Sequence, residues 1–146
     1  MSRAVIIYDT RSGNTGIMAR AIEEGMAEAG IEVMSRRTVS ATAGDAKDVE
    51  AVILGSRAYH SDMMDSMKTF LFEMEKVNLK GKVGAAFGSY GWSGEAPKLV
   101  LEVMKNKFEM SVIEPSLVIR YLPDAAGLER CRELGKRIAE RLIDTT

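Results

Sequence analysis

The chain has few of the residues that build metal centres and disulfide frameworks. It contains one cysteine, Cys131, and one histidine, His60, among 146 residues. A single cysteine cannot form an internal disulfide, and zinc sites need a set of Cys and His ligands. One histidine also argues against a dinuclear iron site made of protein side chains. We therefore expect no bound metal, and any redox chemistry must come from an organic cofactor.

Long apolar runs and an excess of one charge are also missing. The apolar run at residues 4–8 is far too short for a signal sequence or a membrane span. The 20 Lys+Arg and 21 Asp+Glu give a formal net charge of −1, whereas nucleic-acid surfaces are strongly basic. We expect a cytoplasmic protein that has neither a membrane nor a nucleic acid as its partner.

What is present is typical of an ordinary globular domain. Hydrophobic residues make up 46% and charged residues 28% of the chain. A domain of this length buries roughly 70% of the surface of its unfolded chain. We expect one domain over residues 1–146, with Cys131 buried on the apolar side of a C-terminal helix.

Strand and helix patterns alternate along the chain. Short apolar runs predict buried strands at 4–8, 51–54, 83–87 and 116–121, and a weaker one at 31–34. Helical periodicity predicts helices from 17 to Gly30 and over 64–77, 96–108 and 128–143, while the link at 38–50 is least regular. This order predicts an α/β fold, a doubly wound three-layer sandwich around a five-stranded parallel sheet.

Three polar loops should meet at one edge of this sheet, because ligands of open α/β sheets bind beyond the carboxyl ends of the strands. They are "DTRSGNT" at 9–15, "GSRAYHSDM" at 55–63 and "FGSYGWSGEA" at 87–96. The first loop precedes a helix and offers hydroxyl, amide and glycine groups, which suits a phosphomonoester. It lacks the lysine of a nucleotide-triphosphatase loop. The alternative is that its polar residues only cap the helix.

Two aromatic residues accompany these loops. Trp92 lies between Gly91 and Ser93, and Tyr59 lies in the second loop. Aromatic rings beside a flexible backbone can flank a flat ring, although Trp92 could instead cover the edge of the domain. Together with the first loop, they predict a planar heterocycle with a phosphorylated tail.

The three loops resemble those of flavodoxins, and "AAFGSYGWSGEA" is similar to the flavodoxin-like domain of flavodiiron proteins, the A-type flavoproteins. The similarity runs over essentially the whole chain. It implies a flavodoxin-like fold with strand order 2-1-3-4-5, and FMN as the cofactor. The stretch "TRSGNT" follows the phosphate-loop pattern of flavodoxins, which implies phosphate contacts from Thr10, Ser12, Gly13, Asn14 and Thr15.

The resemblance also implies a site for the rest of FMN. Tyr59 and Trp92 would flank the isoalloxazine ring. Backbone groups that would meet the ring edge and the ribityl chain belong to Ser56, Arg57, Ala58, Ser89, Tyr90 and Gly91. The predicted set is completed by Gly88 and by three residues whose roles stay open. Arg11 and Arg57 either face solvent or stabilise phosphate or reduced flavin, and His60 is either a surface residue or tunes the flavin.

The implied function is an electron carrier that shuttles electrons between redox proteins, which dock at the exposed flavin edge. One alternative is an FMN-dependent reductase that passes electrons from NAD(P)H to a quinone, and another is a cofactor-free interaction domain. A response-regulator receiver domain has the same strand order, but it would need an acidic pair after the first strand and an aspartate at the end of the third. Here Asp9 stands alone and Gly55 and Ser56 occupy the second place, so we set this alternative aside. The donor, the acceptor, the redox potentials and the choice between monomer and homodimer are not predicted.

Overall fold

A computed structural model describes residues 2–9, 13–56, 58–59, 62–63, 65–90, 95–120 and 122–144. Its main sheet is parallel, with the order β2-β1-β3-β6 followed by β7 and β8, which both pair with β6. The strands are β1 (Arg3–Tyr8), β2 (Glu32–Arg37), β3 (Ala51–Gly55), β6 (Val83–Tyr90), β7 (Ser111–Val112) and β8 (Leu117–Arg120). The predicted order 2-1-3-4-5 is confirmed, and β7 and β8 share its fifth position.

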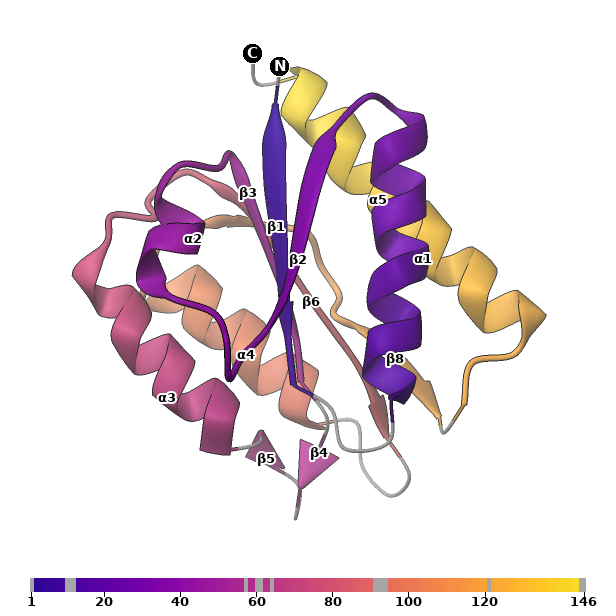
Figure 1. The fold of residues 1–146 in the computed structure, drawn as a ribbon, viewed down its shortest axis with the longest axis horizontal. Coiled ribbons are helices and arrows are strands. Elements are labelled where there is room, and N and C mark those ends of the chain that lie inside the picture. Colours follow the sequence, from indigo (N-terminus) through magenta and orange to yellow (C-terminus); the bar gives the residue numbers. More distant parts are fainter. Residues whose placement is uncertain are drawn as a thin grey trace.

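Helices cover both faces of this sheet and complete the predicted three-layer sandwich (Figure 1). On one face lie α1 (Asn14–Glu28) and α5 (Ala125–Asp144), and on the other lie α3 (Asp65–Glu73) and α4 (Glu95–Asn106). Two short elements, α2 (Ala43–Lys47) and the 3₁₀ turn η1 (Met74–Lys76), belong to the second face. The irregular link at 38–50 therefore contains only one short helix.

The strands are apolar on both sides because each side faces a helix layer. Along β1, Ala4 and Ile6 pack in the core beneath α1 and α5, whereas Val5 and Ile7 pack in the core beneath α3 and α4. The same alternation divides β3, and all of these strand residues are buried. The continuous apolar runs of the sequence thus correspond to a sheet that is covered on both faces.

The first helix packs against the last through two glycines. A Cβ added at Gly25 would collide with the carbonyl oxygen of Arg132, and one added at Gly135 would collide with that of Ile22 and lie 2.9 Å from the nitrogen of Met26. Two helix backbones come this close only where no side chain intervenes. The α1–α5 contact is therefore set by glycine on both helices.

The C-terminal end of α1 confirms the predicted stop at Gly30. Gly30 has a φ of 86°, and its N–H donates to Ala27 O at 3.0 Å while the N–H of Ile31 donates to Met26 O at 3.1 Å. This pair of bonds is the Schellman motif, which satisfies the last carbonyls of a helix. Ile31 and Met26 are both buried in the core under α1 and α5, so an apolar contact accompanies the motif.

One predicted strand boundary is wrong, and one predicted loop contains a ladder that was not expected. The strand expected at 83–87 continues to Tyr90, so that Gly88, Ser89 and Tyr90 lie in β6 and not in the third loop. The reason is tertiary, because β8 pairs in parallel with β6 from Phe87 to Tyr90 and fixes that backbone. The second predicted loop contains a two-stranded antiparallel ladder between β4 (Ala58–Tyr59) and β5 (Asp62–Met63).

Candidate functional site

The carboxyl ends of β1, β3 and β6 meet at one edge of the sheet (Figure 1). The N-terminal ends of α1, α3 and α4 begin at the same edge, and the β4–β5 ladder lies beside α4 and β6. Parallel strands joined by crossover helices produce this arrangement, because each strand runs toward the edge from which its helix returns. The elements that follow the predicted loops are therefore gathered in one place.

The first helix starts at a glycine in the left-handed conformation. Gly13 is the N-cap of α1 with φ 87°, and as a glycine it forms no side-chain cap bond itself. The first helical bond runs from the N–H of Ile17 to Gly13 O at 3.0 Å. The N–H groups of Asn14, Thr15 and Gly16 precede it and have no intrahelical acceptor. They carry the positive end of the helix dipole to the edge of the sheet.

A pair of hydroxyl groups lies directly behind this helix start. The oxygens Oγ1 of Thr15 and Oγ of Ser89 are 3.4 Å apart. The exposed fraction is 0% for Thr15 and 3% for Ser89, so the pair is closed off from solvent by protein. It joins the first turn of α1 to the last residues of β6, which are 74 positions apart in the sequence.

A second polar pair connects β1 to β3. The Ser56 hydroxyl donates to Oδ2 of Asp9 at 3.3 Å, and both residues are buried. The backbone continues the ladder at this point, since the N–H of Asp9 donates to Gly55 O at 3.0 Å and that of Ser56 to Phe87 O at 2.9 Å. Asp9 was not among the residues predicted from sequence, although it opens the first polar loop.

Gly88 is required by packing at the same edge. A Cβ at this position would collide with the carbonyl oxygen of Ser56 and lie 2.8 Å from Cγ of Pro97. The neighbouring strand β3 and the first turn of α4 therefore occupy the space that a side chain would need. This close approach explains the glycine inside β6, where the sequence suggested a flexible loop.

The structure describes about half of the predicted site residues. Gly13, Asn14 and Thr15 form the start of α1, Ser89 meets Thr15 directly, and the Ser56 side chain pairs with Asp9. Ala58 and Tyr59 form β4, and the half-buried Tyr90 ends β6. Seven predicted residues lie outside the described residues, namely Thr10, Arg11, Ser12, Arg57, His60, Gly91 and Trp92.

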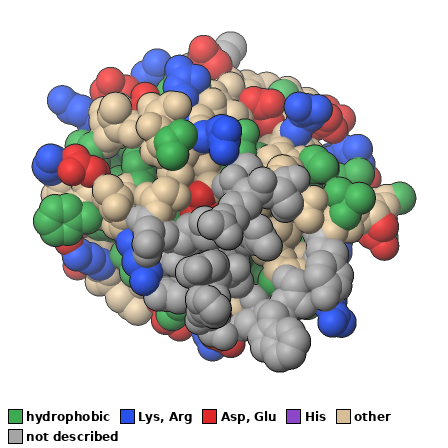
Figure 2. Space-filling view, turned by 60° about the horizontal axis from the view of Figure 1, so that its bottom comes forward, with side chains coloured by type: hydrophobic (Ala, Val, Ile, Leu, Met, Phe, Trp, Pro, Cys, Tyr) green, Lys and Arg blue, Asp and Glu red, His purple; other side chains and the backbone are tan. Residues whose placement is uncertain are grey.

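Charges of both signs are interspersed on the described surface around this edge. Figure 2 shows Lys and Arg side chains alternating with Asp and Glu side chains, and neither sign forms a continuous field there. Over the described residues, no group of three or more His, Cys, Asp or Glu side chains could hold a metal ion. In the same part of the chain, no helix is long and apolar enough to cross a membrane.

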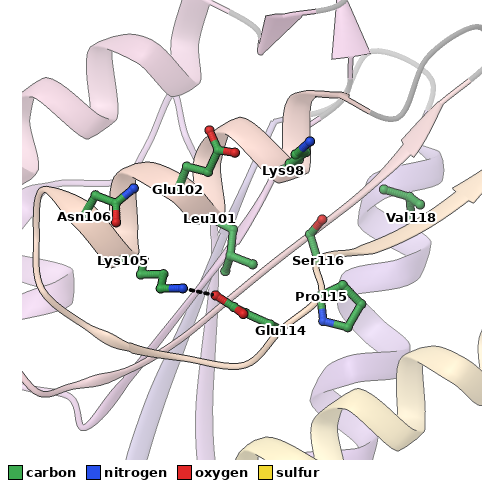
Figure 3. A pocket seen from close by; sticks show the side chains of 9 residues that line it. All are labelled: Lys98, Leu101, Glu102, Lys105, Asn106, Glu114, Pro115, Ser116 and Val118. Atoms are coloured by element: carbon green, nitrogen blue, oxygen red, sulfur yellow. Dashed lines mark hydrogen bonds and ion pairs between the residues drawn. The ribbon is translucent and has the colours of Figure 1, made fainter.

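A separate groove of about 520 Å³ runs between α4 and the segment that leads into β8 (Figure 3). Lys105 reaches across it to Glu114, with Nζ and Oε1 2.7 Å apart. Its lining consists of Lys98, Leu101, Glu102, Lys105, Asn106, Glu114, Pro115, Ser116 and Val118. None of these residues was predicted to bind a ligand, and they follow the outer edge of the sheet.

The chain is similar to known proteins over nearly its whole length. The nitric oxide reductase of Moorella thermoacetica is 34% identical over 147 residues, which is 98% of this chain and 37% of that protein. A flavodoxin from the domain Archaea matches with 38% identity and a TM-score of 0.92 over 96% of this chain and 98% of its own. The rubredoxin oxygen:oxidoreductase of Desulfovibrio gigas matches with 25% identity and a TM-score of 0.91 over 99% of this chain and 37% of its own.

This chain thus spans little more than a third of the length of curated relatives such as the reductase, with 37% covered. The model of the family described as flavodoxin matches residues 6–135. That match includes the carboxyl end of β1, all of β3 and β6, and the start of α1, the elements that meet at the candidate site. With the parallel sheet, the helix start behind β1 and this match in agreement, the chain belongs to the flavodoxin family.

Proposed function

We propose that this chain holds FMN at the carboxyl edge of its sheet and carries electrons between redox proteins. The observation that carries the proposal is the start of α1. There a left-handed glycine and a helix N-terminus meet a buried hydroxyl pair in a member of the flavodoxin family. Flavodoxins are FMN-binding electron-transfer proteins, and this arrangement supplies neutral donors for a phosphate.

The residues at this helix start fit a phosphomonoester. The position of a Cβ at Gly13 has no described heavy atom within 4 Å, so that a ligand can approach the backbone. The N–H groups of the first turn and the Thr15 hydroxyl are donors, which a dianion requires. Thr10, Ser12 and Asn14 are proposed to complete the phosphate contacts, and Arg11 is proposed as part of the same set.

The flavin ring and its sugar chain are proposed to lie beside β6 and the β4–β5 ladder. Tyr59 and Trp92 would flank the ring. Backbone groups of Ser56, Arg57, Ala58, Ser89, Tyr90 and Gly91 would meet the ring edge and the ribityl chain, with His60 and Gly88 nearby. The described members of this set lie at one sheet edge, which supports a single ligand that contacts all of them.

Bound FMN would supply the ability to accept and release one or two electrons. The protein residues bind the phosphate, orient the ring and exclude water from one side of it, while the exposed edge of the ring faces the docking partner. We propose that residues 1–146 act as one domain in the cytoplasm, as a monomer or homodimer. Nitric oxide reduction is named for a relative of which this chain matches 37%, and the proposal here is limited to electron transfer.

A visible spectrum of the purified protein tests FMN binding directly. We expect a yellow protein that releases FMN on denaturation, at one FMN per chain, and an apoprotein that takes FMN up again. The control is riboflavin, which has the same ring without the phosphate and should bind more weakly. A folded apoprotein that takes up no FMN would contradict the proposal and favour the cofactor-free interaction domain.

Steady-state kinetics separates the carrier from the reductase. We expect the FMN-loaded protein to oxidise NADPH or NADH with a quinone acceptor no faster than free FMN does, and to pass electrons only when a reducing protein is supplied. Turnover of NAD(P)H with a quinone, at rates well above free FMN, would show the reductase alternative instead.

A further inference from the structure

We propose that Ser89 is a positioning residue, whose hydroxyl donates to Thr15 and so directs the Thr15 proton to the FMN phosphate. This inference rests on the proposed function, because it assumes that the phosphate binds at the start of α1. The sequence resemblance gave Ser89 a different role, in which its backbone meets the flavin ring. The structure places its side chain beside the helix start.

The position of Ser89 in β6 determines where its side chain points. Strand side chains alternate between the two faces of a sheet. Phe87, two residues earlier, packs in the core beneath α1 and α5, and Ser89 therefore lies on this same face. Its Oγ is 3.4 Å from Oγ1 of Thr15 in the first turn of α1. Ser89 pairs with Ile119 of β8, which holds its backbone on that side, and the pairing of β6 with β3 ends two residues earlier, at Phe87.

The proton count then assigns a direction to this contact. A hydroxyl group has one proton to donate and two lone pairs that accept. If Thr15 donated to Ser89, it would have no proton left for an anion at the helix start. When Ser89 donates, the Thr15 proton is available to a phosphate oxygen, and the two bonds polarise each other in the same direction.

Burial makes this direction matter. Thr15 and Ser89 are closed off from solvent, so that water cannot replace either partner at low cost. Removing the Ser89 hydroxyl would leave Thr15 free to turn toward other acceptors, while the backbone of the cradle keeps its shape. The loss of the Ser89 hydroxyl should therefore weaken the binding of a ligand that has a phosphate and leave the binding of one without a phosphate unchanged.

Affinities of FMN and riboflavin for the apoprotein, measured by quenching of flavin fluorescence, test the inference. We expect Ser89→Ala to raise the Kd of FMN several-fold, up to roughly tenfold, as for a lost neutral hydrogen bond that orients another donor. Its Kd for riboflavin should stay within about twofold of wild type. Ser89→Cys retains the shape of serine with a slightly larger atom and a weak donor, and it should behave like Ser89→Ala.

Two further variants complete the design. In a Thr15→Val background, Ser89→Ala should add less than about twofold to the Kd of FMN, because the group through which it acts is gone. Thr38→Ala changes another buried polar residue, placed just beyond β2 and outside the predicted site. It should leave both affinities unchanged, and the thermal unfolding of each apoprotein checks that the variants are folded.

The outcomes are distinct. If Ser89→Ala weakened the binding of FMN and riboflavin equally, Ser89 would have a merely structural role and the inference would be wrong. An unchanged affinity for FMN, or independent effects of the Thr15 and Ser89 changes, would also overturn it. Failure of the folded wild-type apoprotein to bind FMN would instead contradict the proposed function.

Discussion

The two ends of α1 have nearly the same backbone conformation but differ in how their backbone polar groups are satisfied. Gly13 before the helix has φ 87° and Gly30 after it has φ 86°, and a Cβ at either would meet no described heavy atom within 4 Å. At Gly30 the chain closes on itself, because the N–H groups of Gly30 and Ile31 satisfy the last carbonyls. At Gly13 the N-cap residue has no side chain of its own with which to cap the helix.

The difference shows how one helix serves both folding and binding. The closed end turns the chain into β2 and buries Ile31 in the core. The other end presents N–H donors at the edge where β1, β3 and β6 finish, with the Thr15–Ser89 hydroxyl pair behind them. Left-handed glycine is therefore a structural requirement at both ends, and only the surroundings of Gly13 suit an anion.

The largest expected effect comes from the contact between α5 and the middle of α1, because this contact holds the whole of α1 in place. Gly135→Val would drive a side chain into the backbone of α1 at Ile22 and Met26. We expect a loss of about 3 kcal/mol or more in the free energy of unfolding, measured with urea. Gly44→Ala is the control, because a Cβ there has one neighbour, Oγ1 of Thr42 at 3.6 Å. Equal stability of the two variants would refute the close helix contact.

The second prediction separates the two ends of α1 directly. Gly13→Ala and Gly30→Ala should each cost about 1–2 kcal/mol of folding free energy, since both force alanine into the left-handed region. Only Gly13→Ala should also weaken the binding of FMN, by about tenfold, since a methyl group there narrows the approach to the N–H groups of the helix. Equal FMN affinity in the two variants would remove the distinction between the ends.

The third prediction concerns the face that α1 shares with α5. Cys131 is buried there, as predicted, and burial raises the pKa of its thiol to about 11 from an ordinary value of 9.0. Between these two values the unfolded chain loses the thiol proton while the folded chain keeps it, so stability falls as pH rises. The decrease should be up to roughly 1 kcal/mol per pH unit over this window.

Two measurements check the thiol. Cys131→Ala should remove this part of the alkaline decrease in the free energy of unfolding, so the wild-type and variant curves should become closer from pH 9 upward. The native thiol should also react slowly with a thiol reagent at pH 8, and a reaction as fast as in the urea-unfolded chain would show that the α1–α5 contact opens readily.

The smallest effect is expected in the groove beside α4, where Lys105 pairs with Glu114. Both side chains are more than half exposed, at 55% and 53%, and such pairs contribute about 0–1 kcal/mol. Lys105→Ala should change stability by less than about 1 kcal/mol and leave FMN affinity unchanged. A clear loss of FMN affinity would place the flavin in this groove and not at the start of α1.

Local patterns were sufficient for most of the fold. The apolar runs located β1, β3 and β8, the weak run located β2, and the helical stripes located α1, α3, α4 and α5 to within a few residues. The spacing of apolar residues follows from which side chains of an element face the core, and this spacing continues along the whole strand or helix. The end of α1 at Gly30 was equally readable, because left-handed conformations favour glycine.

The end of β6 could not be read in the same way. Gly88 and Ser89 have little preference for strands, and the sequence around them looks like a loop. They are in a strand because β8, about thirty positions later, pairs with them. The fifth position of the sheet is likewise divided in two, because β7 pairs with the start of β6 and β8 pairs with its end.

Local sequence patterns predict the kind and order of the elements, the sheet edge that the polar loops follow, and the resemblance that implies FMN. These follow from local spacing and from residue types that act over a few positions. Three contacts become visible only in the folded chain: Ser89 faces Thr15, Ser56 pairs with Asp9, and Gly88 fits between Ser56 and Pro97. Each of these contacts joins residues far apart in the chain, and strand register, which no local pattern contains, brings them together.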